Sequence, residues 1–248
     1  MFTFYEVGGK VRDEILGLES KDVDYVAVPN EVLLSQYTKA EDMFKVLVDY
    51  LNQEKFTIFL ITENCFTIRA MFPKEHKYTG VADFVMTRKE IGYVEGTRTP
   101  IVVPGTLYDD LERRDFTVNA IAKNEEGMYI DYFNGMVDLR NKILRTPLDA
   151  KVTMMDDPLR ILRALRFSIT KDFEIHDTVY NAMDQPDILE KMRTTVSGER
   201  IREELHKMFK YDTIKTIRRI DDIDENLIEG FHELIFGNGL WLKPTFEQ

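Results

Sequence analysis

The sequence contains very little cysteine and no long apolar segment. Its 248 residues include a single cysteine, Cys65, which excludes an internal disulfide and a cysteine-rich zinc site. No apolar run approaches the roughly 18 to 20 residues needed to cross a bilayer, and the N-terminus lacks the charged and apolar regions of a signal peptide. We therefore expect a cytoplasmic protein with no membrane partner.

The sequence also has no excess of positive charge. The chain has 33 Lys and Arg against 44 Asp and Glu, a net charge of -11. This balance argues against a protein that coats nucleic acid nonspecifically, because phosphate contacts supply most of that affinity. Basic residues nevertheless cluster locally, so a positive groove on an acidic body remains compatible with RNA binding.

The sequence has no internal repeat and no low-complexity segment, but its pattern changes along the chain. Residues 1–145 mix strand and helix patterns, and the pattern is helical from about Asp156 onward. We expect an α+β fold with a mixed sheet in a head over 1–145, an all-α neck over 146–195 and a short helical body over 196–248.

Individual elements follow from periodicity and from turn residues. A helix is predicted over 40–53 and strands over 56–61, 65–72 and 81–87. Glycines and prolines predict a mobile loop over 90–105. Asp156 and Asp157 before Pro158 predict a helix start, and Ser197 predicts another.

The most informative motif lies at the N-terminus. Gly8 and Gly9 follow a short apolar run and precede a helical pattern, which indicates a strand, a close backbone turn and a helix N-terminus that favours phosphate. Residues 21–28 predict a strand because they are rich in β-branched and aromatic side chains. Residues two apart on a strand share a face, so Asp22 and Asp24 should project together.

Paired carboxylates of this kind can hold hard cations. Two Mg²⁺ ions bound by carboxylates lower the pKa of an attacking hydroxyl and neutralise charge on a transferred phosphoryl group. A lone Asp-x-Asp is usually a solvated strand end, but the glycine pair at this distance favours the metal interpretation. We expect Asp22 and Asp24 to be catalytic metal ligands, and Asp83 is a further catalytic candidate whose alternative is a surface acid at a strand end.

Two later segments carry arginines beside acids. In residues 110–120, Arg113 and Arg114 could bind triphosphate oxygens bidentately, or the segment could be an exposed helix start with an Asp cap. In residues 157–167, Asp157 is followed at spacing three by Arg160, and then by Arg163 and Arg166. These side chains share a helix face, which could line a cleft or be a salt-bridged surface.

An Asp acceptor beside an Arg donor is complementary to two bases. Cytosine and adenine each present an amine donor next to a ring-nitrogen acceptor, and uracil and guanine reverse that order. A pair such as Asp157 and Arg160 would therefore select C and A without a nucleic-acid template.

Taken in order, these motifs resemble those of the class II tRNA nucleotidyltransferase and bacterial poly(A) polymerase family. The resemblance covers most of residues 4–210, including 131–139 and 196–201. It implies a polymerase-β-type nucleotidyltransferase head, a neck that reads the base and a body that holds RNA. It also implies Mg²⁺ at Asp22 and Asp24, and nucleotide contacts at Gly8, Gly9, Arg12, Arg114, Asp115, Asn119, Asp157, Arg160, Arg163 and Arg166.

The chain departs from the family pattern in three places. Asp156 and Asp83 stand where the family more often has Glu, which shortens the reach of each carboxylate. Full bacterial members continue through longer body and tail helices, whereas this sequence ends at Gln248. RNA would then be held by a minimal body, by a second subunit or poorly, and the oligomeric state is left open.

The resemblance implies addition or repair of the 3′-terminal CCA of tRNA. A hydroxyl at the RNA 3′ end would attack the α-phosphate of CTP or ATP and release pyrophosphate. Alternatives with the same chemistry are A-adding, CC-adding and poly(A)-tailing enzymes. A noncatalytic RNA-binding relative and transfer onto a non-RNA acceptor are further alternatives.

Overall fold

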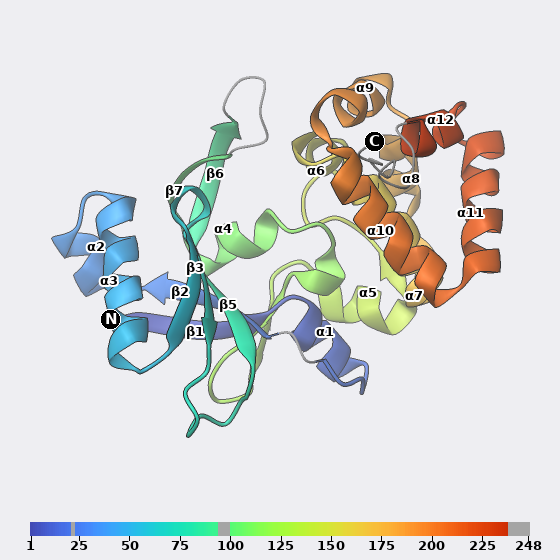
Figure 1. Cartoon of the computed structure of the whole chain (residues 1–248). Coiled ribbons are helices and arrows are strands. Elements are labelled where there is room, and N and C mark those ends of the chain that lie inside the picture. The colour runs from blue at the N-terminus through green and yellow to red at the C-terminus, as the bar shows by residue number, and fades with distance from the viewer. Residues whose placement is uncertain (21–22, 94–99, 238–248) are drawn as a thin grey trace, which may run out of the picture. The chain divides into compact units, whose positions relative to one another are not determined.

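A computed structural model describes residues 1–20, 23–93 and 100–237 of the chain (Figure 1). The chain divides into two compact units, Met1–Asn141 and Lys142–Gln248. The first unit combines a large sheet with helices, and the second consists almost entirely of helices. The predicted α+β class, with a mixed sheet followed by a helical extension, is confirmed.

The first unit is organised by a seven-stranded sheet with the strand order β3-β4-β5-β2-β1-β8-β9. Strands β2 and β5 are parallel, and the other neighbouring pairs are antiparallel. The sheet strands are β1 (Phe2–Val7), β2 (Val23–Pro29), β3 (Thr57–Thr62), β4 (Thr67–Met71), β5 (Val81–Met86), β8 (Ile121–Lys123) and β9 (Tyr129–Asp131).

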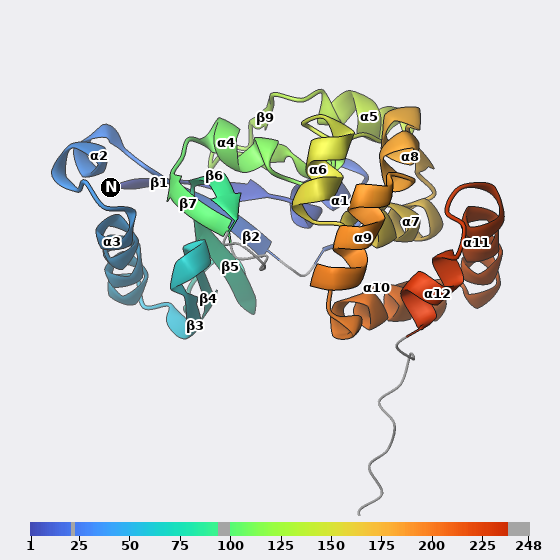
Figure 2. The same cartoon turned by 90° about the horizontal axis from the view of Figure 1, so that it is seen from above.

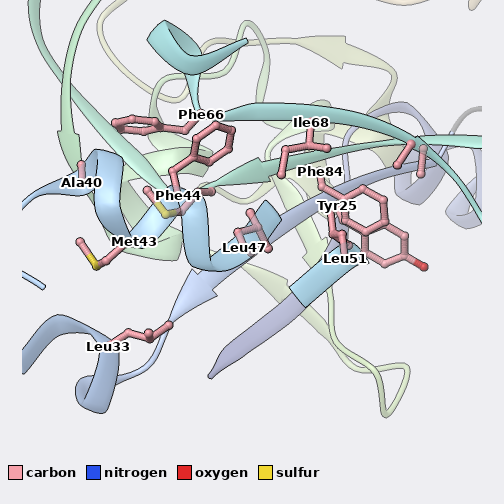
Figure 3. Packing of buried hydrophobic residues seen from close by; sticks show 14 of the residues in the cluster. Tyr25, Leu33, Ala40, Met43, Phe44, Leu47, Leu51, Phe66, Ile68 and Phe84 are labelled. Carbon is pink, nitrogen blue, oxygen red and sulfur yellow. The ribbon is translucent and has the colours of Figure 1, made fainter. Parts of the chain in front are cut away.

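One face of this sheet packs against α3 (Ala40–Gln53), the helix predicted from its apolar spacing. Figure 3 shows Leu51 beside Tyr25 and Phe84 of the sheet, and Phe44 beside Phe66 at the other end of the cluster. Strand side chains alternate between the two faces. Because Tyr25 faces α3, its neighbours on β2 face the other way.

The opposite face is covered by a second apolar cluster. Val7 and Val26 of the sheet pack there with Leu107 and Leu111 of α4 (Leu107–Glu112). Asp24 shares this face, since it lies two residues from Val26 on the same strand. The remaining short elements of the unit are α1 (Gly9–Ile15), α2 (Glu31–Gln36), η1 (Glu63–Cys65), η2 (Thr117–Asn119) and α5 (Gly135–Asn141).

The loop predicted over 90–105 is wrong for much of its length. Strands β6 (Arg88–Tyr93) and β7 (Pro100–Pro104) form an antiparallel hairpin there, and residues 94–99 lie outside the described part of the chain. Proline is compatible with the ends of a strand in a two-stranded ribbon, where no central ladder bond is lost. Pro100 and Pro104 are therefore the first and last residues of a strand.

The second unit contains seven helices in its described part (Figure 2). They are α6 (Ala150–Asp156), α7 (Arg160–Thr170), α8 (Asp177–Met183), α9 (Pro186–Thr195), α10 (Gly198–Tyr211), α11 (Thr213–Asn226) and α12 (Phe231–Phe236). A small parallel ladder joins β10 (Ile143–Leu144) to β11 (Glu174–Ile175). None of the helices in the described ranges has the length and apolar character needed to cross a membrane.

Both predicted helix starts in this unit are close to observed ones. Ser197 is the N-cap of α10, and its side chain accepts a hydrogen bond from the Arg200 amide. The other start needs a correction, because Asp157 closes α6 and α7 begins only at Arg160. The Asp157 carboxylate accepts a 3.2 Å bond from the Leu159 amide, so it organises the turn between the two helices.

Candidate active site

The turn after β1 brings two charged groups against a glycine. Gly8 has φ of 71° and ψ of -139°, a conformation open to glycine because it has no Cβ. A methyl group at Gly8 would lie 3.2 Å from Arg114 Nη1 and 3.2 Å from Asp24 Oδ2. The predicted strand, turn and helix are therefore present, and they bring together three of the predicted site residues. The helix α1 itself has only seven residues.

Asp24 and Asp83 lie opposite each other on the parallel strands β2 and β5. Residues in register on neighbouring strands are about 4.8 Å apart in the backbone and point to the same face. Both residues are half-buried. Asp83 Oδ1 also lies 3.4 Å from Arg69 Nε on β4, an arginine whose side chain is largely exposed. The sheet thus places two carboxylates side by side on the face that carries the Gly8 turn.

Arg12 is held in a buried hydrogen-bonded chain. Its Nη1 donates a 2.7 Å bond to Asn119 Oδ1, and its Nε donates a 2.9 Å bond to Asp13 Oδ1. Asn119 Nδ2 in turn donates to Asp115 Oδ1 at 2.9 Å, and the same oxygen accepts from the Phe116 amide. A methyl group at Gly9 would lie 3.6 Å from Arg12 Nη2. The predicted residues Gly9, Arg12, Asp115 and Asn119 are therefore neighbours.

Asp110 anchors the two arginines that follow it. Its side chain is fully buried, Arg114 Nη2 donates to Asp110 Oδ2 at 3.0 Å, and Arg113 pairs with the other oxygen. Burial alone would raise the pKa of Asp110, but the charges of Arg113 and Arg114 lower it below its ordinary value. Asp110 thus stays ionised and fixes the Arg114 guanidinium beside Gly8. The exposed-helix-start alternative does not describe this segment, because Asp110 is buried.

The donor set around Asp24 is suited to a hard divalent cation, although it is described only in part. Aspartate oxygens are the ligands that Mg²⁺ prefers, and Asp24 with Asp83 supplies them from one sheet face. Within 1–20, 23–93 and 100–237 no three acidic, histidine or cysteine side chains are grouped closely enough to hold a metal. Asp22, the other predicted ligand, lies outside the described residues. The oxygen donors present fit the predicted ion.

In the second unit, the side chains of Asp157 and Arg160 contact different neighbours around the turn between α6 and α7. Arg200 Nη2 of α10 donates a 3.0 Å bond to Asp157 Oδ2. Arg160 Nη1 donates a 3.1 Å bond to the Thr153 carbonyl oxygen on α6. The two side chains that were predicted to read a base are therefore each oriented by a neighbouring helix.

Arg163 and Arg166 are oriented by one buried carboxylate. Glu204 of α10 is only 3% exposed. Arg166 Nε lies 2.5 Å from Glu204 Oε2, and Arg163 Nη1 lies 4.0 Å from Oε1. Burial alone would raise the pKa of Glu204. The charge of Arg166 and its hydrogen bond lower the pKa, and the net result is a value below the ordinary one, so the carboxylate remains ionised. Arg160, Arg163 and Arg166 are half-buried at spacing three on α7, as predicted.

Three anchoring residues were not predicted to belong to the site. Glu204 carries a recognisable signal, since it lies on the buried face of α10 with Ile201, Leu205 and Met208. An acid on such a face needs a positive partner. Asp110 stands three and four residues before its arginines, which is helical pairing distance. Arg200 carries no such signal, because its partner is 43 residues away.

Comparison with known proteins shows the family of the chain. The family model of the poly A polymerase head domain matches residues 4–145. The chain is 31% identical over 233 residues to tRNA nucleotidyltransferase cca1 of Schizosaccharomyces pombe, covering 93% of this chain and 45% of that protein. It is 35% identical over 210 residues to a CCA-adding enzyme of Lactococcus lactis, covering 84% of this chain and 46% of that one.

A solved structure is also similar to this chain. The chain matches the Thermotoga maritima CCA-adding enzyme complexed with tRNA, with a TM-score of 0.70 and 27% identity, over 98% of this chain and 50% of that one. The chain spans about half the length of the curated relatives it matches. From the head-domain match and these relatives, the chain belongs to the class II CCA-adding enzyme and poly(A) polymerase family.

Proposed function

We propose that this chain transfers CMP and AMP from CTP and ATP to the 3′ end of tRNA, without a nucleic-acid template. The observation that carries the proposal is the alignment of Asp24 with Asp83 on the face that holds Gly8 and Arg114. Phosphoryl transfer needs groups that stabilise charge and groups that position the phosphates. The carboxylates, the fixed guanidinium and the glycine turn can supply them. Membership of the family supports the same chemistry.

In the proposed reaction, the 3′-oxygen of the RNA forms a bond to the α-phosphorus of the nucleotide. The bond from that phosphorus to the oxygen bridging to the β-phosphorus breaks, pyrophosphate leaves, and the hydroxyl proton is lost. Asp24 and Asp83, together with Asp22, would hold Mg²⁺ beside these atoms. The ions would supply charge neutralisation and an easier deprotonation of the hydroxyl.

The arginines of the head would position the triphosphate. Arg114 flanks Gly8 and keeps one guanidinium nitrogen on Asp110, which orients the rest of the group. Gly8 leaves room at this point, since any side chain would displace Arg114 and Asp24. Arg12 is buried and held by Asp13 and Asn119, so it would act mainly by fixing the turn that carries the glycines. Asp115 and Asn119 would support Arg12.

The second unit would select the base. Asp157, Arg160, Arg163 and Arg166 all belong to the segment that begins at the turn before α7. The contacts with Arg200, Thr153 and Glu204 limit the freedom of these side chains. A fixed donor and acceptor pair discriminates between bases by about 1 to 3 kcal/mol for each bidentate contact. Within this unit, residues 146–195 would form a neck that reads the base, and residues 196–248 would form a body that holds RNA.

The runner-up function is A-addition, CC-addition or poly(A) tailing of RNA 3′ ends. It is supported by the matched family model, whose description names poly A polymerase. The tRNA acceptor is favoured because the relatives compared above are named tRNA nucleotidyltransferase and CCA-adding enzyme. Cytoplasmic residence is part of the proposal and can be checked by fractionation of the source cells.

Product analysis separates these functions. The full chain is incubated with Mg²⁺ and each labelled NTP in turn, with tRNA lacking CCA, lacking only the terminal A, or complete. The proposal predicts C addition to the first, A addition to the second and no extension of the third. Long A tails on arbitrary RNA would establish the runner-up, and absence of transfer to any of these RNAs would contradict both.

A further inference from the structure

A cavity of about 280 Å³ lies on the other side of the head sheet from Asp24. The register of β1 and β2 gives the side of the sheet on which the cavity lies. Glu6 pairs with Tyr25, and the next pair along these two strands is Val7 with Asp24. Successive side chains on a strand point to opposite faces. Glu6 and Tyr25, which both line the cavity, therefore share the α3 face, and the acids of the candidate active site share the other one.

The walls of this cavity are mainly aromatic. Tyr25 stacks on Phe84 with ring centroids 5.2 Å apart and planes 9° apart, and Figure 3 shows both rings beside Leu51. Phe4 stacks on Tyr50 at 5.5 Å, and Phe56 meets Phe84 edge to face at 5.1 Å. These five rings all line the cavity. Stacked rings present faces with negative electrostatic potential, which attract cations.

A buried carboxylate is part of the same lining. Glu6 is 6% exposed, and its Oε1 accepts a 2.6 Å bond from the Tyr78 hydroxyl and a 3.4 Å contact from Tyr25. Burial and the nearby Glu6 charge raise the pKa of both tyrosines above the usual range, so both hydroxyls remain donors. Within the described residues, no group donates to the buried Oε2 of Glu6. A buried carboxylate in such a setting is stabilised by a positive charge.

Two lysines line the cavity, and one of them, Lys123, stands opposite Glu6 in the β1–β8 register and is attracted by its charge. Lys123 Nζ lies 2.6 Å from Glu14 Oε1, and Lys77 Nζ lies 4.9 Å from the centre of the Tyr78 ring. His76 also lines the cavity, and burial together with Lys77 lowers its pKa, which favours its neutral form. Glu54 and Glu125 add two further acids to the lining. The site therefore combines aromatic faces with an excess of negative charge.

We propose that this cavity binds a small organic cation, a primary ammonium or guanidinium group on a short alkyl chain. The Oε2 atom of Glu6 has no donor within the described residues and would accept N–H bonds from the ligand, and the rings would stack on its apolar body. The ligand's positive charge would balance the three acids of the lining, which face only two lysines. An anionic ligand is disfavoured by Glu6, Glu54 and Glu125. The cavity volume is near the lower end for ligand pockets, about 300 Å³ and upward, which limits the ligand to a few carbon atoms.

Three probes with one alkyl body test this assignment on the full chain. n-Butylguanidinium has charge and N–H donors, n-butylurea has donors without charge, and n-butyltrimethylammonium has charge without donors. Protein-observed NMR titration should give saturable binding for the guanidinium, with probe-to-ring NOEs at Tyr50 and Phe56. The urea and the quaternary ammonium should each bind roughly tenfold or more weakly, since hydrogen bonds to a charged group are strong.

The variant Glu6→Gln provides the matched test, with Glu229→Gln, an exposed glutamate of the second unit, as its control. Glu6→Gln should weaken n-butylguanidinium binding by roughly ten- to a hundredfold, and the control should leave it unchanged. If Glu6→Gln does not fold, the wild-type NOEs still decide. Equal affinity for the urea, NOEs only to other parts of the chain, or unchanged binding in a folded Glu6→Gln protein would each overturn the proposal.

Discussion

Arg12 donates a 2.7 Å hydrogen bond to Asn119, a residue 107 positions away in the sequence. Both residues are buried, and the bond ties the glycine turn after β1 to the segment that carries Arg114. Asn119 also donates to Asp115, so one amide side chain connects a cation to an anion. This contact joins the two sequence motifs that we assign to the triphosphate.

Replacing Asn119 by alanine should therefore destabilise the head. The change leaves Arg12 Nη1 without its 2.7 Å acceptor and removes the donor to Asp115, and an unsatisfied buried polar group costs about 1 to 3 kcal/mol. Urea unfolding measures the loss in unfolding free energy. Asn181→Ala on α8, at an exposed position, should stay within about 0.5 kcal/mol of wild type. Equal effects of the two variants would contradict the role of this contact.

Asp110→Asn should cost stability in a pH-dependent way. Removing one partner of a buried ion pair typically costs about 3 to 5 kcal/mol, and the neutral amide would leave the charges of Arg113 and Arg114 without this carboxylate at neutral pH. The pKa of Asp110 lies below its ordinary value of 3.8 in the folded state, so its stabilising effect is present above that pH and is lost as the pH falls through the folded value. The difference between variant and wild type should therefore be largest at pH 7 and shrink below pH 3.8.

Urea unfolding at a series of pH values checks this expectation. Asp49→Asn on α3 is a suitable control, because Asp49 is exposed and its replacement should change the unfolding free energy by no more than about 0.5 kcal/mol. A loss in Asp110→Asn that stays constant down to pH 3 would show that the ion pair with the arginines is not its cause.

Gly8→Ala separates backbone strain from damage to the site. The new methyl group would meet both Arg114 and Asp24 at 3.2 Å in a positive-φ conformation. Gly17→Ala is the matched control, since Gly17 has the same φ of 71° but nothing within 4 Å of the added atom. Both variants should lose roughly 1 to 3 kcal/mol of stability, because a residue with a side chain is strained at this positive φ.

Only Gly8→Ala should also impair nucleotide use. We expect a fall in kcat/KM for CTP of at least about tenfold, measured at a temperature where both variants are folded, because sub-ångström displacement of positioned groups lowers catalysis strongly. Equal kcat/KM in the two glycine variants would remove Gly8 from the proposed triphosphate site.

Arg160→Ala should relax the choice of nucleotide. The guanidinium is half-buried and fixed by the Thr153 carbonyl at 3.1 Å, so its loss removes one donor from the proposed base-reading set. The ratio of kcat/KM for CTP and ATP to that for UTP and GTP should fall by roughly ten- to a hundredfold. Arg193→Ala, at an exposed position on α9, should leave this ratio unchanged. An unchanged ratio in Arg160→Ala would exclude its role in selection.

Local sequence signals predicted the parts of the fold that depend on neighbouring residues. The glycine turn, the face of Asp24 and the helix over 40–53 all follow from periodicity or backbone preference. The hairpin β6–β7 does not follow from the sequence pattern, because prolines occur both at the ends of short strands and in loops. Composition within a few residues cannot distinguish these two cases.

The contacts between distant segments could not be predicted in the same way. Asp83 lies beside Asp24 because β5 pairs in parallel with β2, after an excursion through α2, α3, β3 and β4. The pairing of Arg166 with Glu204 similarly depends on the packing of α7 against α10. Spacing along the chain identified the arginines but carried no information about the acid that orients them.

We propose Asp24 and Asp83 as the catalytic centre, and single-turnover transfer of labelled CMP to tRNA lacking CCA tests this assignment most directly. Asp24→Asn and Asp83→Asn should keep the wild-type fold by circular dichroism and still bind CTP measurably. Asp24→Asn should reduce transfer by at least about a thousandfold, and Asp83→Asn should reduce it strongly, because charge stabilisation at the reacting phosphate is lost. Wild-type transfer rates in a folded Asp24→Asn protein would contradict the account.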